Sequence, residues 1–517
     1  MPASPLALPP VRLLPADVLA GQALAAPLLD RALRLTRWTG EERRVDGMGE
    51  LLDDELAAAV EVLGLTGDEA TADAAQAWGV AVDTGLLVLE IEEEAEESTP
   101  PGEAAGRAVP GELYARIGAD GSGDGADPHD VLDLWLGALE CALAEATAPD
   151  YDNLPGDPDG DGEAVSAEEA DRDAEAEAEL LDAALVNLYA LSAMEDGRAE
   201  EGANGAGEGE GTGTDGGPAV PLPVLAASLV LPEEEAEQPS EEVLEEVTAV
   251  MLGLDEHFRL LEATGLVAYT PMDDALVEEA DDEGAVPLGG GPDEPDEEEI
   301  ARYGAVRLTP LGVYGVRERL TDAGVPAPVL GDLAGADADD LLGALGSYPD
   351  HAVRIEAEAW LARREPGKAA AQLLAAAQGD GADGPTRRLV CQQVLALLGA
   401  QAEPAVRDVL DDPRLGGLAR VWLSERNAPD VPAPTTDMVY WLTIDTIAAQ
   451  LAADEDAGEL ASLVTELVAR HEEFFADAWR VEHPATAAVL EAIGRLHPDR
   501  PTAKASRKAA FKARSRH

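Results

Sequence analysis

Three acidic stretches rich in glycine and proline interrupt the apolar pattern of this chain and limit what can fold. They cover residues 149–177, 195–217 and 272–299, and the second reads EDGRAEEGANGAGEGEGTGTDGG. Almost no apolar side chain occurs in that second stretch, so burial cannot offset the entropy lost on ordering it. We therefore expect residues 195–217 to be disordered, and the other two stretches to be an acidic linker and an acidic loop.

The blocks between these stretches are predicted to be mainly helical. The chain has 517 residues, and at about 150 residues per domain it is long enough for about three domains. Aromatic residues make up only 4%, so the cores must consist of Leu, Val and Ala, a mixture that favours helices over strands. We expect domains over residues 1–148, 178–329 and 330–517, with the linker 149–177 after the first.

The second of these domains has the clearest order of elements. We predict helices over 178–194, 221–231, 241–264 and 311–321, and strands over 265–270 and 305–309. In this order, and in the pairing of the two strands around the acidic loop 272–299, residues 178–321 resemble the winged-helix superfamily. Residues 16–91, with helices at 16–38 and 51–63 and a strand at 85–91, are predicted to be a degenerate copy.

The third domain is predicted to be a succession of helices of about a dozen residues, separated by Gly, Pro or Asp. We place them at approximately 337–346, 350–364, 366–378, 385–398, 402–411, 413–425, 435–452, 456–470, 484–496 and 501–514. The helix, Asp-Pro turn and helix over 402–423 resemble a HEAT-type unit, so we expect an irregular HEAT-like helical array. As a whole, the chain resembles actinobacterial proteins that join winged-helix-like units to a helical-repeat tail; this resemblance implies a fold and carries no activity.

The net charge narrows the classes of partner. Asp and Glu number 105 against 35 Lys and Arg, a formal net charge of -70, which repels nucleic acid and anionic lipid at long range. The two cysteines, Cys141 and Cys391, form no CxxC pair, which argues against a disulfide scaffold or a zinc module. The N-terminal sequence does not resemble a signal peptide, and no apolar run is long enough to span a bilayer. We expect a cytoplasmic location and no membrane partner.

One acidic segment matches the pattern of a calcium-binding EF-hand loop. Asp157, Asp159, Asp161 and Glu168 have the spacing D-x-D-x-D-G-x5-E, in which alternating carboxylates surround one cation. However, a Pro-Gly pair precedes the loop where a helix should enter, Ala164 replaces the usual large apolar residue, and no second hand follows. We therefore interpret the segment as a solvated acidic loop.

The sequence contains no complete motif for catalysis or cofactor binding. A zinc-protease pattern begins at His471, but Phe475 stands where the second histidine is needed. The glycine-rich run follows no strand and opens no helix, and neither a phosphate-binding loop GxxxxGK[ST] nor a GxSxG elbow is present. The sequence thus predicts no catalytic, cofactor-binding or metal-binding residue, and indicates a protein that is not an enzyme.

Two basic islands stand out against the acidic background. They are the candidates for anion or nucleic-acid contact: Arg31, Arg34, Arg37, Lys504, Arg507, Lys508, Lys512 and Arg514. We expect a helix over 500–514 to pack on the helix 484–496, with Ala503, Ala510 and Phe511 inward and the three lysines outward. The cations of this tail are predicted to interact with the protein's own carboxylates.

These features together predict the function only in outline. The helix 241–264 carries many glutamates and a single basic residue, Arg259, so a phosphate-lined groove would repel it. We predict a non-catalytic protein-interaction or regulatory scaffold with another protein as partner. The alternatives are a nucleic-acid-associated transcriptional regulator that uses the basic C-terminal tail, and an enzyme with no recognisable motif.

Overall fold

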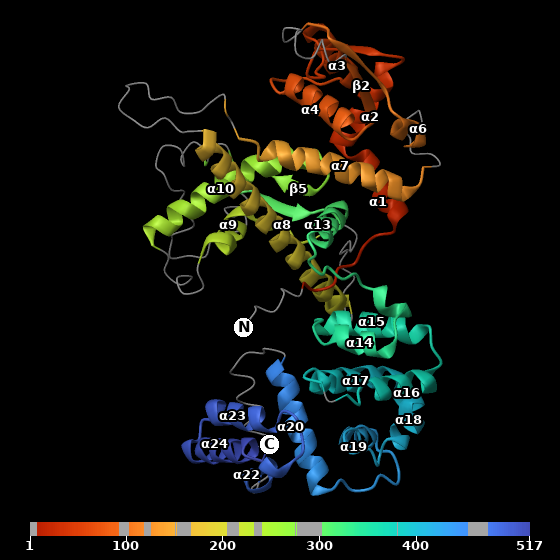
Figure 1. Cartoon of the computed structure of the whole chain (residues 1–517), viewed down its shortest axis with the longest axis vertical. Coiled ribbons are helices and arrows are strands. Elements are labelled where there is room, and N and C mark those ends of the chain that lie inside the picture. The colour runs from red at the N-terminus through yellow and green to blue at the C-terminus, as the bar shows by residue number, and fades with distance from the viewer. Residues whose placement is uncertain are drawn as a thin grey trace. The chain divides into compact units, whose positions relative to one another are not determined.

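The chain divides into two compact units, Met1–Ala327 and Pro328–His517 (Figure 1). The computed structural model describes residues 8–516 apart from 92–102, 118–125, 150, 152–166, 204–216, 232–239, 274–275, 277–301, 380 and 453–473. Within the described residues the fold is mainly helical, with two small three-stranded sheets. The division falls near residue 329, where the sequence predicts the end of the second domain.

The N-terminal unit contains the same order of elements twice: helix, strand, two helices and two strands. The first set is α2 (Pro27–Thr39), β1 (Arg43–Val45), α3 (Asp53–Leu63), α4 (Ala70–Asp83), β2 (Leu87–Ile91) and β3 (Gly106–Pro110). The second set is α8 (Ala167–Ala203), β4 (Val220–Pro221), α9 (Leu222–Val230), α10 (Glu241–Glu262), β5 (Val267–Thr270) and β6 (Ala305–Leu308). Both sheets are antiparallel and place the last strand in the middle, in the orders β1-β3-β2 and β4-β6-β5.

A Thr-Gly-Leu sequence follows the third helix of each set, at residues 84–86 and 264–266. The two glycines, Gly85 and Gly265, have φ angles of 76° and 75°, in the left-handed region that favours glycine at the end of a helix. The leucine after each glycine is fully buried. The two sets therefore share a local chain reversal as well as a topology.

Among the described residues, the N-terminal unit also contains α1 (Ala16–Ala25), α6 (Glu112–Ile117), α7 (Pro128–Ala146) and α13 (Pro310–Asp322). Helix α7 contacts α2 and α4 of the first set and α10 of the second. Its buried Trp135 donates a hydrogen bond from Nε1 to the carbonyl oxygen of Thr264 at 2.8 Å. One hydrophobic cluster includes residues from both sets, so residues 1–148 and 178–329, expected as two domains, share a core.

Two predicted helix boundaries are wrong for identifiable reasons. The expected helix 16–38 is two helices, because Pro27 cannot donate a backbone hydrogen bond and forces extended backbone at Ala26 (ψ 129°). Helix α8 includes residues 167–177 of the predicted linker and 195–203 of the predicted disordered stretch. Its first turns consist mainly of Ala and Glu, which are strong helix formers despite their lack of large apolar side chains.

Three elements of the first set, β1, α4 and β3, were not anticipated from the sequence. Helix α4 buries Ala74, Ala77, Trp78 and Ala81, which have helical spacing but include no leucine. Strand β3 lies directly after the acidic segment that begins at residue 92, and it pairs with both β1 and β2. Small buried residues and a short strand next to a polar run give little periodic signal.

The C-terminal unit is a succession of helices close to the predicted ranges. They are α14 (Ala338–Leu345), α15 (Asp350–Ala362), α16 (Pro366–Ala376), α17 (Gly384–Leu398), α18 (Glu403–Asp408), α19 (Gly416–Glu425), α20 (Thr436–Ala452), α22 (Phe474–Asp477), α23 (Thr486–Leu496) and α24 (Arg500–Arg514). Short 3-10 turns lie at Asp332–Gly335, Gly399–Ala402 and Ala478–Arg480. The predicted helix 456–470 lies outside the described residues. One hydrophobic cluster joins α14 to α19, and a second joins α20, α23 and α24.

Candidate functional site

The third helix of each set in the N-terminal unit presents an acidic or neutral face to solvent. Among the side chains of α10 whose burial the structure describes, the exposed charged ones are Glu245, Glu246, Glu256, Arg259 and Glu262. The only cation among them, Arg259, is bound to Asp255 through Nε at 2.8 Å. On α4 the exposed positions carry Thr71, Ala72, Ala75 and Asp83, without a cation. Neither face offers the uncommitted positive charge that a phosphate backbone requires.

The predicted arginine island on the first helix is largely used inside the fold. Arg31 forms an ion pair with Asp73 of α4 at 3.2 Å. Arg34 donates hydrogen bonds to the carbonyl oxygens of Val62 at 2.8 Å and Leu63 at 3.1 Å, at the end of α3. Arg37 is exposed. Two of the three predicted contact residues therefore hold α2 against its neighbours.

The C-terminal helix α24 has the predicted range and the predicted outward lysines. It packs on α23, and its buried positions are Ala503, Ser506, Ala509, Ala510 and Ala513. Lys504, Lys508 and Lys512 are all exposed. Among the predicted arginines, Arg514 forms an ion pair with Glu491, and Arg507 donates from Nε to the carbonyl oxygen of Ala503. Pairing with the protein's own carboxylates is thus seen for Arg514.

The predicted inward position of Phe511 is wrong. Its side chain is 72% exposed, whereas the small residues Ala509, Ala510 and Ala513 occupy the interface with α23. The two helices also approach closely near the start of α24: a Cβ added to Gly494 would lie 2.6 Å from Cγ of Arg507 and 3.3 Å from the carbonyl oxygen of Ala503. An interface this tight has no room for an aromatic ring, which is why Phe511 faces solvent.

The calcium-loop residues are only partly described. Glu168 lies in the first turn of α8, while Asp157, Asp159 and Asp161 lie outside the described residues. Among the residues that the structure describes, no group of three or more His, Cys, Asp and Glu side chains could hold a metal ion. In the same part of the chain, no helix combines the length and hydropathy needed to cross a membrane.

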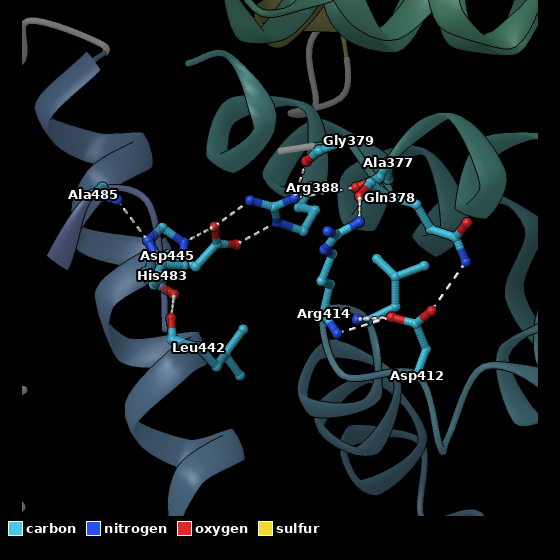
Figure 2. A network of polar contacts seen from close by, with 12 residues as sticks. Ala377, Gln378, Gly379, Arg388, Asp412, Arg414, Leu442, Asp445, His483 and Ala485 are labelled. Atoms are coloured by element: carbon cyan, nitrogen blue, oxygen red, sulfur yellow. Dashed lines mark hydrogen bonds and ion pairs between the residues drawn. The ribbon is translucent and has the colours of Figure 1, made fainter. Parts of the chain in front are cut away.

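A buried polar network that spacing did not predict lies in the C-terminal unit (Figure 2). Arg388 of α17 donates two hydrogen bonds to the carboxylate of Asp445 of α20, at 2.9 and 2.7 Å. His483, in the loop before α23, contacts the same carboxylate through Nε2 at 3.0 Å. The side chains of all three are 5% exposed or less. Because α17 belongs to one hydrophobic cluster of this unit and α20 to the other, the network joins the two clusters.

The geometry of His483 decides what this network can do chemically. Its Nδ1 accepts a hydrogen bond from the backbone N–H of Ala485 at 3.0 Å, so the proton must lie on Nε2, which donates to Asp445. With both ring nitrogens engaged, the ring has no position left for a substrate proton. An Asp–His pair of this kind resembles part of a catalytic triad, but here it orients backbone and helix and serves as structure.

The charge state of Asp445 follows from its neighbours. Burial alone would raise the pKa of this carboxyl group, but hydrogen bonds from His483 and Arg388, with the charge of Arg388, outweigh it and hold the pKa below its ordinary value. Arg388 also donates to the carbonyl oxygens of Ala377 and Gly379, at 3.2 and 2.9 Å. Four hydrogen bonds thus hold the guanidinium, and a buried charge requires such partners.

An open cavity of about 1100 Å³ lies beside this network. Tyr440, Trp441 and Trp479 supply its aromatic lining, and His483 forms part of its wall. Its basic residues are Arg414, Arg480 and Arg516, and its acidic residues are Asp437, Asp477 and Glu482. Asp477 pairs with Arg480 and Glu482 with Arg516, so two of the three positive charges are neutralised at the rim.

The residues of the network and the cavity are separated by tens of positions in sequence. Arg388 and Asp445 are 57 residues apart, and Asp445 and His483 are 38 apart. One feature of the sequence could have indicated the network: Asp445 lies in the middle of an otherwise apolar stretch, the Tyr440–Ala452 part of α20. A buried carboxylate requires a cationic partner, although the sequence does not indicate which one.

Comparison of the chain with protein-family models, with curated proteins and with solved structures finds no match.

Proposed function

We propose that this protein is a non-catalytic protein-interaction scaffold whose N-terminal unit holds two winged-helix-like modules that bind protein. The proposal is supported by the twofold element order and by the two sheets with the last strand in the middle. It is also supported by the resemblance of residues 178–321 to winged helices. The successive helices of the C-terminal unit, taken as a HEAT-like array, form the second part of the scaffold.

The charge of the third helices is the observation that carries the proposal. In winged-helix and helix-turn-helix proteins that read DNA, this helix enters the major groove and faces phosphates on both sides. Here Glu245, Glu246, Glu256 and Glu262 occupy the exposed face of α10, and α4 exposes no cation. Like charges repel, so α10 suits a partner protein with a basic surface, and α4 offers no positive charge to attract a phosphate backbone.

Affinity capture with a matched pair of variants tests this function. The full chain is used as bait in its native cytoplasm, and co-purifying proteins are identified by mass spectrometry. One variant neutralises three carboxylates of α10 (E245Q, E246Q and E256Q). The control neutralises three exposed carboxylates of α8 (D173N, E175Q and E179Q) and changes the net charge equally.

The expected result is a protein partner that is retained by wild type and by the control, and that the α10 variant loses at least tenfold. Loss of the partner in the α10 variant alone identifies the helix, because net charge changes equally in the control. Equal recovery with all three baits would exclude the α10 face as the docking surface. Recovery of the partner only in the presence of duplex DNA would contradict the protein-binding function.

A further inference from the structure

The C-terminal helix α24 carries an unusual concentration of positive charge. Three of the four lysines of the chain lie on it, at positions 504, 508 and 512, and its sequence contains no Asp or Glu. From residue 474 to 517 there are nine Lys and Arg against four Asp and Glu, in a chain of net charge -70. The local field therefore has the opposite sign to that of the whole protein.

The lysines of α24 form no ion pairs with carboxylates that the structure describes. Lys504 and Lys508 form no ion pair with any residue that the structure describes. Lys512 places its Nζ 5.1 Å from the centre of the Trp479 ring, a cation–π contact that leaves the ammonium group at the surface. Pairing with the protein's own carboxylates, as expected from the sequence, therefore does not account for the lysine row.

An exposed aromatic ring lies within the same face. Phe511 is on the solvent side of α24, next in sequence to Lys512 and one turn from Lys508, and it is 72% exposed. Burying such a ring is worth about 1.5–3 kcal/mol, so its exposure is a cost to the isolated protein. Cations interleaved with an exposed ring are typical of surfaces that bind unpaired nucleic acid, because phosphates meet the charges and a base stacks on the ring.

The surface continues beyond the helix as far as Trp479. The guanidinium of Arg480 lies 4.5 Å from the centre of the Trp479 ring, which Lys512 also contacts. Arg480 is itself paired with Asp477, and Arg516 is paired with Glu482, so the positive charge of this surface comes mainly from the lysines of α24. The positive, aromatic surface thus begins on α24 and ends at Trp479, which lies on the wall of the cavity.

We propose that the exposed face of α24 binds single-stranded nucleic acid. Lys504, Lys508 and Lys512 are one helical turn apart, about 6 Å along the axis, which suits successive phosphates of an extended strand. Phe511 stacks on a base, which it can do only where the base is unpaired. This site is separate from α4 and α10, the third helices of the two sets in the N-terminal unit, and neither proposal depends on the other.

Fluorescence anisotropy with the full chain and a labelled twelve-nucleotide oligothymidine tests the proposal. Wild type is expected to bind at low salt, with affinity that falls as salt rises. The triple variant K504Q, K508Q and K512Q should bind at least tenfold more weakly. It should also flatten the slope of log affinity against log salt by about 2, since each phosphate contact to a single strand contributes about 0.7. F511A should lose about tenfold with the slope unchanged, and F511W should retain binding.

The matched control is R354Q, R363Q and K368Q, which removes three exposed cations from the same unit. It should bind as wild type does. Circular dichroism should be unchanged in every variant, because the buried face of α24 consists of alanines and Ser506, which none of them alters. Absence of wild-type binding at low salt, or equal losses in the triple variant and the control, would overturn the proposal. So would a duplex, or a polyglutamate peptide, that competes as well as the single strand.

Discussion

At the scale of single residues, the clearest feature is a buried ion pair that holds two helical clusters together. Arg388, Asp445 and His483 come from three separate segments, and each polar atom that faces the interior has a partner. Trp441 packs edge-on against His483, with ring centres 4.6 Å apart, and both side chains line the adjacent cavity. Such a group specifies one arrangement of the helices, because any other leaves charges buried without partners.

Replacing Asp445 by Asn should destabilise the C-terminal unit by about 3–5 kcal/mol, because the charge of Arg388 would remain buried without its counter-ion. Urea denaturation of wild type and D445N measures this loss. The exposed D437N variant on the same helix is the control and should be close to neutral. A loss below about 1 kcal/mol for D445N would show that the pair is not a structural clamp.

The difference in unfolding free energy between wild type and D445N should become smaller as the pH falls. The pKa of Asp445 is lowered in the folded protein, so its carboxylate stabilises the fold fully above the ordinary pKa of about 4. That stabilisation is lost as the pH falls through the lowered value. The difference in unfolding free energy between wild type and D445N should therefore be constant from pH 6 to 5 and narrow below pH 4. A difference that grows on acidification would contradict this assignment.

The two cysteines should be poor nucleophiles in the native protein. Burial raises the pKa of Cys391 to about 12, and burial with the nearby charge of Asp83 raises that of Cys141. Labelling with iodoacetamide at pH 8 should leave Cys391 unmodified and modify Cys141 slowly, and both should react fully in denaturant. Rapid labelling of native Cys391, read by mass spectrometry, would contradict the packing of α17.

At the scale of elements, the two sets of the N-terminal unit can be compared position by position. Gly85 and Gly265 have the same left-handed backbone, but their surroundings differ. A Cβ at residue 85 would meet nothing within 4 Å, whereas at residue 265 it would lie 3.3 Å from the Cβ of Ala26. The pair therefore separates the cost of backbone strain from the cost of crowding.

G85A should destabilise the N-terminal unit by about 1 kcal/mol, the cost of a left-handed residue with a side chain. G265A should cost more, since it adds the contact with Ala26. Thermal and chemical denaturation of the full chain, monitored on residues 1–327 by hydrogen exchange, measures both. Equal losses, or a stabilising G265A, would mean that the two turns are not built as described.

Calcium at sub-millimolar concentration should leave the thermal midpoint unchanged. Glu168 lies in the first turn of α8, where the helix dipole already stabilises a carboxylate, so it needs no cation there. The measurement is a calcium titration of the melting temperature. A midpoint that rises with calcium in wild type but not in E168Q would instead establish a metal site.

A helix or strand can be predicted from the sequence when large apolar side chains mark the face that it buries. The helices of the C-terminal unit were predictable because Leu and Val recur between Gly, Pro and Asp breaks. Helix α4 was not predicted because most of the side chains on its buried face are alanines. Alanines also fill the α23–α24 interface, and Phe511, which was expected there, faces solvent instead. The Arg388–Asp445 pair could not be predicted, because spacing along the chain does not reveal which buried charges meet.

At the scale of the whole molecule, the two units differ in the chemistry of their exposed helices. In the N-terminal unit, most exposed charged residues of α10 are acidic. In the C-terminal unit, lysines occupy the exposed face of α24. A net charge of -70 repels nucleic acid at long range, so any strand that α24 binds is expected to bind only weakly and with strong salt dependence. Both surfaces are on helices held by buried cores, so each can be altered without unfolding its unit.

We propose that α4 and α10, the third helices of the two sets in the N-terminal unit, bind protein. Hydrogen exchange of the full chain, alone and in complex with the partner recovered by affinity capture, tests it most directly. Exchange should slow within 241–262 and 70–83 on binding, and stay unchanged within 500–514. Protection confined to residues 328–517, with none on α10 or α4, would contradict the claim.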